Sequence, residues 1–391
     1  MKTAAVIAEF NPFHNGHKYL CETARNLGAD RVIAVMSGNW VQRGDTAIIS
    51  KFARAKQALK CGFDLVVELP TYWAMSTAQS FATGAIDIIS NLGADMLVFG
   101  SECGDATKIM KAAYCIRSKE FENTLKELLS NGIPLAKARE TAVEQLCGNG
   151  DVLSSPNDTL ATEYILAAKS INSKMSFHAV KRTGVDHDSD KSSGDICSAS
   201  MLRNLIKKGD LYEAGRFMPP AAYEILKDEY ENGKVSDINR LEKPILAFLR
   251  TASPEHYKVL PDISEGIENR IYGAVRMSAT LDELMEYTAA KRYTNARLRR
   301  LILAAALGEN AENIPKYVPY IRVLGCNRLG ADILTCARTF SKLPIIMRAT
   351  SLKGEPTFEF ENKATDIYAL SQASPPDCGA EFTNGIIVIK E

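Results

Sequence analysis

The sequence predicts an α/β protein in which a doubly wound parallel sheet is followed by a mainly α-helical domain. Over the first 100 residues, short apolar runs typical of strands buried on both faces alternate with amphipathic helical patterns. A glycine follows each of these helical patterns, where a C-terminal cap is expected. Strand–helix–strand repetition with short connections favours parallel strands joined by right-handed crossovers.

The individual elements follow from these patterns. Strands are expected at 3–8, 31–36, 64–68, 95–99 and 176–181. Helices are expected at 17–27, 50–60 and 76–92, capped by Gly28, Gly62 and Gly93, and again at 197–208 after a polar loop at 183–195. Beyond Pro219 and Pro220 the pattern is helix after helix, without strands, to about residue 350.

The change in pattern predicts three parts of the chain. Residues 1–212 are expected to form the sheet domain and residues 213–350 the helical domain. Residues 351–391 carry seven acidic and three basic side chains and end in a β-like run at 385–390. We expect this last part to be an acidic tail that packs back on the body.

The composition excludes several classes of protein. The 47 Lys and Arg side chains balance the 47 Asp and Glu side chains, so any site for a polyanion must be a local cluster. Nine cysteines without a CxxC pair argue against a zinc ribbon or a redox dithiol and favour reduced thiols in a cytoplasmic protein. No uncharged apolar run approaches the length of a membrane span. We therefore expect neither a membrane nor DNA as a partner.

The chemistry is concentrated in the turn after the first strand, which ends in His14-Asn15-Gly16-His17. Neither a GxGxxG nor a GxxxxGK[ST] pattern is present. A helix that starts at the carboxyl end of a parallel strand offers free N–H groups to an anion. Gly16 lets a phosphate approach the backbone. His14 and His17 add donors that stabilise charge developing on phosphate oxygens, and we expect both to be catalytic. The alternative is that both histidines are structural.

This HNGH segment resembles the HxGH signature of the nucleotidyltransferase superfamily, whose members have a HIGH-type, Rossmann-like domain. The superfamily's second signature, ISSTxIR, has a counterpart at residues 196–203, with Ser200 in place of Thr and Leu202 in place of Ile. The resemblance implies that Ser198, Ser200 and Arg203 hold phosphates. Ser198 and Ser200 alone also fit an ordinary helix N-cap.

Further segments resemble the tRNA(Met) cytidine acetate ligase family, from residue 1 to roughly 350. They are 10–17, 36–44, 68–70, 99–102, 155–157, 181–182 and 296–300. The resemblance implies an enzyme that activates acetate with ATP as acetyl-adenylate, with Mg²⁺ assisting. It then implies acetylation of N4 of the wobble cytidine in elongator tRNA(Met). The acidic tail matches no part of this resemblance.

The resemblance also implies which residues contact ATP. These are Ile7, Ala8, Glu9, Phe10, Asn11, Pro12, Phe13, His14, Asn15, Gly16 and His17, with Gly100, Asn157 and Arg182 at the adenosine or the phosphates. Arg43 is expected to neutralise acetate or a phosphate. Simpler roles stay open: Gly100 as a turn residue, Asn157 as a helix N-cap, and Arg43 and Arg182 as loop or surface charges. Lys51 and Arg54 are expected on the solvated face of their helix. No side chains are expected to form a metal site.

The helical domain offers a candidate tRNA-binding surface at residues 291–300, which hold five basic residues and no acid. Lys291, Arg292, Arg297 and Arg300 are expected to contact RNA phosphates, and Tyr293 to stack on a base. Arg297 and Arg300 share a helical face, whereas Arg299 points elsewhere. A solvated helix face is the alternative.

Two other functions stay open on the sequence. A small-molecule nucleotidyltransferase would adenylylate a phosphopantetheine-like or nicotinamide-nucleotide-like acceptor, but such enzymes seldom need a large helical domain. A non-catalytic RNA-binding protein would not need both HNGH and SASMLR intact.

Overall fold

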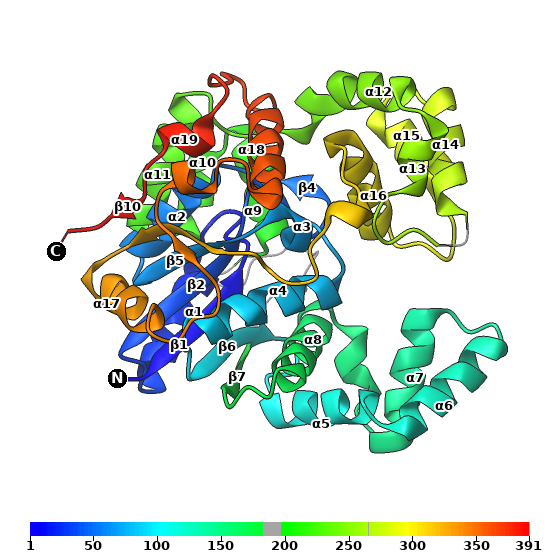
Figure 1. The fold of residues 1–391 in the computed structure, drawn as a ribbon, viewed down its shortest axis with the longest axis horizontal. Coiled ribbons are helices and arrows are strands. Elements are labelled where there is room, and N and C mark those ends of the chain that lie inside the picture. The colour runs from blue at the N-terminus through cyan, green and yellow to red at the C-terminus, as the bar shows by residue number, and fades with distance from the viewer. Residues whose placement is uncertain (183–196, 265, 391) are drawn as a thin grey trace.

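The computed structural model describes residues 1–182, 197–264 and 266–390. Its centre is an eight-stranded sheet with strand order β10-β8-β5-β2-β1-β6-β7, in which β9 also pairs with β8 (Figure 1). The strands are β1 (Thr3–Ala8), β2 (Arg31–Ser37), β5 (Leu65–Leu69), β6 (Met96–Ser101), β7 (Ser176–Lys181), β8 (Ile321–Cys326), β9 (Ile345–Ile346) and β10 (Ile387–Val388). A separate antiparallel hairpin, β3 (Trp40–Val41) and β4 (Asp45–Thr46), follows β2.

The predicted fold class is confirmed. β1 runs parallel to β2 and β6, β2 to β5, and β6 to β7. The side chains of Ala4 and Val6 join one hydrophobic core and that of Ala5 joins the other, as alternation along a strand buried on both faces requires. All five predicted strands are present, with ends within two residues of the predicted ones. The predicted loop at 183–195 lies outside the described residues.

Helices cover both faces of the sheet. On one face lie α1 (Asn15–Asn26), α2 (Lys51–Lys60), α9 (Ala199–Lys208), α10 (Leu211–Arg216) and α11 (Pro220–Glu231). On the other lie α3 (Thr71–Ala74), α4 (Ala78–Asn91), α8 (Pro156–Ser170) and α17 (Arg328–Ala337). Gly28, Gly62 and Gly93 follow α1, α2 and α4 with positive φ angles, as expected for left-handed caps.

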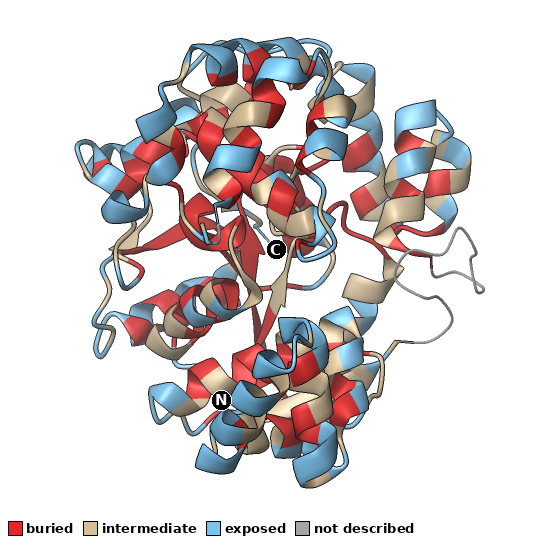
Figure 2. Cartoon of the chain, turned by 90° about the vertical axis from the view of Figure 1, so that its right-hand side faces the viewer, coloured by how far each residue is buried: buried red, intermediate tan, exposed pale blue. Residues whose placement is uncertain are grey.

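Two groups of helices extend from the sheet toward the right of Figure 1. The first lies between β6 and β7: α5 (Ala106–Ile116), α6 (Lys119–Ser130), α7 (Leu135–Cys147) and the 3₁₀ turn η1 (Gly150–Ser154). The second lies between α11 and β8: η2 (Ile238–Leu241), α12 (Glu242–Thr251), α13 (Pro254–Lys258), α14 (Ile267–Met277), α15 (Leu281–Thr288), α16 (Asn295–Leu307) and η3 (Ala311–Asn313). Exposed residues lie mainly on the outer sides of both groups (Figure 2). None of the helices in the described part of the chain has the length and apolar character that a membrane crossing requires.

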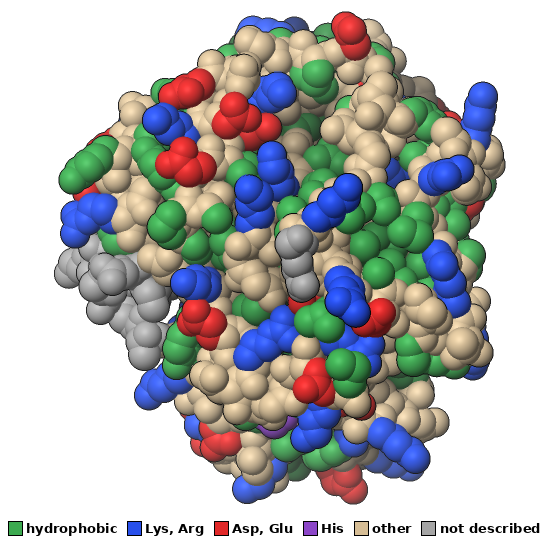
Figure 3. All heavy atoms as spheres, turned by 90° about the vertical axis from the view of Figure 1, so that its left-hand side faces the viewer, with side chains coloured by type: hydrophobic (Ala, Val, Ile, Leu, Met, Phe, Trp, Pro, Cys, Tyr) green, Lys and Arg blue, Asp and Glu red, His purple; other side chains and the backbone are tan. Residues whose placement is uncertain are grey.

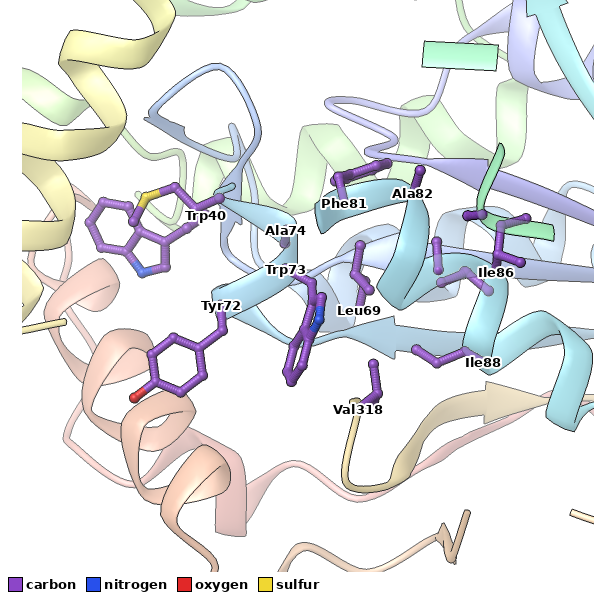
Figure 4. Packing of buried hydrophobic residues seen from close by; sticks show 14 of the residues in the cluster. Trp40, Leu69, Tyr72, Trp73, Ala74, Phe81, Ala82, Ile86, Ile88 and Val318 are labelled. Carbon is purple, nitrogen blue, oxygen red and sulfur yellow. The ribbon is translucent and has the colours of Figure 1, made fainter. Parts of the chain in front are cut away.

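Aromatic side chains belong to the hydrophobic core on one face of the sheet, a core that also includes residues of the second group of helices. Trp40, Tyr72 and Trp73 gather where β3 and α3 meet (Figure 4). A Cβ atom at Gly84 of α4 would lie 2.5 Å from Cδ1 of Trp73, so glycine is what lets the indole ring pack on this helix. On another side of the molecule, over β10 and α17, basic and acidic side chains are interspersed (Figure 3), as the zero net charge leads one to expect.

The prediction of uninterrupted helices to residue 350 is wrong at β8. This strand lies between β5 and β10, antiparallel to β5, and all six of its residues are buried. A short apolar run among helices does not by itself distinguish a strand from a buried helix turn. The C-terminal segment continues with η4 (Ala349–Leu352), α18 (Pro356–Ala369) and α19 (Ala380–Thr383) before β10 joins the sheet. The sheet is therefore completed by residues far beyond 212.

The prediction that Lys51 and Arg54 lie on a solvated helix face is also wrong, because both are 0% exposed. Arg54 donates hydrogen bonds to the main-chain carbonyls of Glu9 (2.6 Å) and Ser37 (3.0 Å). It thereby ties the ends of β1 and β2 together.

Lys51 lies in a buried cluster of charges. Its Nζ contacts the carboxylates of Glu68 and Glu381 and lies 3.2 Å from Oε1 of Glu361, while Nη2 of Arg322 lies 2.9 Å from Oε2 of Glu381. Three carboxyl groups thus face two cations. Burial raises the pKa of Glu68, and the neighbouring Lys51 opposes this effect. Since Glu361 and Glu381 belong to α18 and α19, the cluster joins the C-terminal segment to α2 and β5.

We expect a chain that ends at residue 212 to lack a stable fold. It would lose β8 and two of the three carboxyl groups that surround Lys51. Removing a partner from a buried ion pair costs about 3–5 kcal/mol, which is large against a total stability of about 5–15 kcal/mol. Near-UV circular dichroism and thermal unfolding measure the effect against the full chain. A cooperative thermal transition in the shortened chain would contradict this expectation.

Candidate active site

The turn after β1 positions the first half of the site. Phe10 has a φ of 47°, in the left-handed region, and the side chains of Phe10 and Phe13 are 0% exposed. Both rings pack against Phe63, with centroids 5.3 and 6.1 Å away. The side-chain Oδ1 of Asn11 accepts a hydrogen bond from the main-chain N–H of Ile48 at 2.8 Å. Contacts with Phe63 and Ile48 thus fix the turn, which leads directly into α1.

His14 and His17 form a capping box at the start of α1. Nδ1 of His14 accepts from the main-chain N–H of Gly16 (3.1 Å), and Nδ1 of His17 accepts from the main-chain N–H of His14 (3.2 Å). The two rings stack with centroids 3.8 Å apart. With Nδ1 accepting, the proton of a neutral imidazole is assigned to Nε2.

The electrostatic environment keeps both imidazoles neutral. Burial lowers the pKa of His14 to about 3, and the nearby cations Arg182 and Arg203 add to the effect. Burial, then His14 and Arg182, hold the pKa of His17 well below its usual value. Each ring therefore offers an uncharged Nε2–H donor at the carboxyl edge of the sheet, beside two arginines.

The second sequence signature meets the first through Arg203. Its Nη1 donates to the main-chain carbonyl of Asn11 (3.0 Å) and its Nη2 donates to Oγ of Ser200 (3.1 Å). Ser198 caps α9, because its side chain accepts from the main-chain N–H of Met201 at 3.0 Å. Ile196, the first residue of this signature, lies outside the described residues.

The ends of β6 and β7 supply the other half of the site. A Cβ atom at Gly100 would lie 3.6 Å from Cγ of Arg182, in ordinary contact. Burial lowers the pKa of Arg182, Glu102 opposes this effect and Arg43 adds to it. Asn157 is not the cap of α8, which is Ser155. The amide of Asn157 instead donates to the carboxylate of Glu102.

Asp158 is a residue of this region that the sequence analysis missed. It is 1% exposed, and its carboxylate accepts hydrogen bonds from the main-chain N–H groups of Glu102 (3.1 Å) and Cys103 (2.9 Å), and from Oγ of Ser101 and Ser155. It therefore locks the loop after β6 onto the start of α8. The sequence feature that could have identified Asp158 is an acidic residue in the first turn of a helix that follows Ser-Pro.

The hairpin between β3 and β4 brings Arg43 to this edge. The main-chain N–H of Gln42 donates to Oε1 of Glu9 at 3.0 Å, which joins the hairpin to the turn after β1. The charge of Arg43 contributes to the lowered pKa of Arg182, so both guanidinium groups add to the positive charge at this edge of the sheet. Neighbouring guanidinium groups are suited to phosphate or carboxylate recognition.

Comparisons with known proteins agree on one family. Residues 1–379 match the family model described as HIGH Nucleotidyl Transferase. The chain is 36% identical over 402 residues to the tRNA(Met) cytidine acetate ligase of Thermoanaerobacter sp. (strain X514), covering 99% of this chain and 100% of the relative. It is 38% identical over 383 residues to that of Caldicellulosiruptor saccharolyticus, covering 95% and 94%. The chain belongs to the tRNA(Met) cytidine acetate ligase family, within the HIGH nucleotidyl transferases.

Solved structures agree with this assignment. Crystal structures of Thermotoga maritima TmcAL, one in apo form and one bound with alpha-thio ATP, superpose with TM-scores of 0.93 and 0.92. Each is 32% identical to this chain, and each match covers 100% of both chains. The resemblance to the tRNA(Met) cytidine acetate ligase family, drawn from short motifs up to about residue 350, is confirmed. The expectation that the acidic tail matches no part of the family is wrong, because the relatives and the solved structures also match the C-terminal segment.

The residues predicted to contact ATP lie in two settings. Ile7, Ala8 and Glu9 lie at the end of β1, and Asn15, Gly16 and His17 begin α1. The buried side chains of Phe10 and Phe13 point into the core, so only their main chain can face a ligand. The main-chain N–H of Asn15 donates to the carbonyl of Phe217, just after α10, at 2.9 Å, and that of Gly16 donates to His14. The expectation that these first N–H groups of α1 are free for an anion is therefore wrong. The contacts with ATP themselves stay predictions.

The basic segment at residues 291–300 is less exposed than the predicted tRNA-binding surface requires. Tyr293 is 6% exposed, so the prediction that it stacks on a base is wrong. Arg297 forms an ion pair with Asp262 (3.1 Å) and also donates to Oγ of Ser264 (2.9 Å). Arg300 donates to the main-chain carbonyl of Gln42 at 3.1 Å. Both arginines thus have intramolecular partners.

Proposed function

We propose that this chain activates acetate with ATP and transfers the acetyl group to N4 of the wobble cytidine of elongator tRNA(Met), as its relatives' name indicates. The observation that carries the proposal is the pair of stacked, neutral imidazoles of His14 and His17 beside Arg182 and Arg203 at the carboxyl edge of the sheet. Neutral imidazole donors beside guanidinium groups suit a polyphosphate. Relatives that match 99% of the chain, helical region included, disfavour the small-molecule nucleotidyltransferase and the non-catalytic RNA-binding protein.

The first step is adenylate formation. An acetate oxygen attacks the α-phosphorus of ATP, the bond to the β-phosphate oxygen breaks, and pyrophosphate leaves with its electron pair. The Nε2–H donors of His14 and His17 would stabilise the charge that grows on the phosphate oxygens. Arg43, Arg182 and Arg203 would neutralise acetate and phosphates. The protein thus supplies position and charge, and the step needs no covalent nucleophile.

The second step is acyl transfer. The cytidine amine attacks the carbonyl carbon of acetyl-adenylate, the acyl–phosphate bond breaks, the nitrogen loses a proton, and AMP leaves. A wobble base reaches this carbonyl only if it is splayed out of the anticodon loop.

Mg²⁺ is expected to accompany ATP. Among the described residues, no three His, Cys, Asp or Glu side chains are grouped as a metal site. The carboxylates near the phosphate region, Glu9, Glu102 and Asp158, already accept hydrogen bonds from the protein. This donor set fits an ion held mainly by phosphate oxygens and water, as Mg²⁺ commonly is in such sites. When bound, it would neutralise charge on the phosphates.

For RNA binding, we propose Lys291 and Arg292 as the phosphate contacts of the basic segment, because both are exposed and precede α16. Changing both to alanine should reduce the log–log dependence of tRNA affinity on salt by about 0.7–0.9 per lost phosphate contact. The matched control is Lys258→Ala, an exposed lysine on α13 of the same group of helices. An unchanged slope in the double variant, on folded protein, would contradict the assignment.

Mass spectrometry tests the proposed function directly. The full chain is incubated with ATP, isotope-labelled acetate and elongator tRNA(Met), and the nucleosides are then analysed. The expected product is labelled N4-acetylcytidine at the wobble position, absent when ATP is omitted or when the wobble cytidine is replaced by uridine. Label in no nucleoside, with ATP binding intact, would refute the proposal.

A further inference from the structure

The 42–44 turn of the hairpin is held between two distant parts of the chain. Its base is fixed by antiparallel pairing of β3 with β4 and by Trp40, whose Nε1 donates to the carbonyl of Ala364 on α18 at 2.9 Å. The hairpin closes with a hydrogen bond from the N–H of Gly44 to the carbonyl of Val41 at 3.0 Å. These contacts fix the base of the hairpin. The position of its tip, which carries Arg43, is set by the contacts of residues 42–44.

Gln42 has both of its main-chain groups engaged. Its N–H donates to Oε1 of Glu9, at the end of β1, and its carbonyl accepts from Nη1 of Arg300, on α16. One contact comes from the nucleotide side and the other from the helical region. The peptide next to Arg43 is thus fixed from both directions.

The backbone of α16 also lies directly against this turn. A Cβ atom at Gly44 would be 2.5 Å from Cβ of Arg299 and 2.7 Å from the main-chain nitrogen of Arg300. Gly44 has a φ of 72°, a conformation that favours glycine. No larger residue fits at this position without displacing the helix, so the turn and α16 pack as one unit.

The side chain of Arg300 is oriented toward the turn rather than toward solvent. Burial lowers the pKa of its guanidinium, and its side chain is half-buried rather than extended toward solvent. Arg299, the next residue along the chain, is exposed. The guanidinium of Arg300 donates to the turn at the main-chain carbonyl of Gln42.

We propose that Arg300 is a positioning residue for acetate activation: it holds the 42–44 turn so that Arg43 meets acetate or phosphate beside Arg182. The inference rests on the proposed function, and it assigns to the helical region a part in the first chemical step, before RNA is bound. A displacement of about 1 Å at a positioning group can lower a rate by 10²-fold. The alternative is that Arg300 contacts RNA phosphate.

The test measures acetate-dependent exchange between ATP and pyrophosphate in the full chain without tRNA. Arg300→Ala is expected to lower kcat/KM for acetate by between about 10- and 100-fold. Arg300→Lys keeps one donor and should recover part of this loss. The matched control is Arg299→Ala, which keeps the Cβ atom against Gly44 and should exchange at the wild-type rate.

A double-mutant cycle shows whether Arg300 acts through Arg43. If it does, adding Arg300→Ala to Arg43→Ala should cost little further activity, because the group being positioned is already gone. Losses that add fully would overturn the proposal, as would an unchanged rate in Arg300→Ala accompanied by a lower salt dependence of tRNA binding. If Arg300→Lys recovers no activity, the hydrogen bond from residue 300 to the carbonyl of Gln42 is not what positions the turn.

Hydrogen exchange at the Gly44 amide gives a readout that does not depend on catalysis. It should become faster in Arg300→Ala and stay unchanged in Arg299→Ala. Should the wild-type chain bind ATP but show no acetate-dependent exchange, the proposed function fails. The amide measurement still decides whether Arg300 holds the turn, and an unchanged rate there would overturn the inference.

Discussion

Changing His17 to glutamine should lower acetate-dependent pyrophosphate exchange by about 10²–10³-fold, the usual cost of removing one preorganised donor. Glutamine at this position keeps a side-chain acceptor for the N–H of His14, so the capping box at the start of α1 can persist. It does not reproduce the Nε2–H donor beside His14 and Arg182. The loss of rate should therefore occur without a large loss of stability.

Comparison with His17→Ala separates capping from chemistry. Alanine removes the acceptor as well, and loss of a cap costs about 0.5–2 kcal/mol, so this variant should lose both rate and thermal stability. His178→Gln, at a half-buried position on β7, is the matched control and should behave as wild type. Exchange within about threefold of wild type in His17→Gln, well inside the loss expected for a donor, would show that the imidazole has no role in the first step.

The largest expected effect on stability comes from Lys51. Changing it to methionine leaves Glu68, Glu361 and Glu381 with Arg322 as the one remaining cation of the cluster. Breaking a buried ion pair by removing one partner costs about 3–5 kcal/mol. We therefore expect a large fall in the midpoint of urea unfolding at neutral pH. Lys56→Met, at an exposed position on the same helix, is the control.

The pH dependence of this variant has a definite sign. Burial raises the pKa of Glu68, and Lys51 lowers the pKa of both Glu68 and Glu361. Without Lys51 this lowering is lost, so the folded variant binds more protons than the unfolded chain. Stability held by such groups is present at low pH and is lost as pH rises. The difference between Lys51→Met and wild type should therefore shrink between neutral pH and pH 5. A difference that grows as pH falls would show that repulsion among these carboxylates does not cause the loss.

The local parts of this protein could be predicted from the sequence because their causes are local. The strands β1, β2, β5, β6 and β7 follow from apolar runs between helices, and the caps at Gly28, Gly62 and Gly93 follow from the demand for positive φ. The HNGH turn follows from its place at the end of β1. The family followed from motifs of this kind, and whole-chain relatives confirm it.

The tertiary structure decided what depends on partners distant in the chain. The local pattern predicts that Lys51 lies on a solvated helix face. It is buried instead, because Glu381, 330 positions later in the chain, packs against it. β8 reads as part of a helical region, yet it pairs with β5. Arg300 reads as an RNA contact, yet it donates to Gln42. The physical reason is the same in each case: whether a charge or a main-chain group is buried depends on which segments fold against it, and a local pattern holds no record of them.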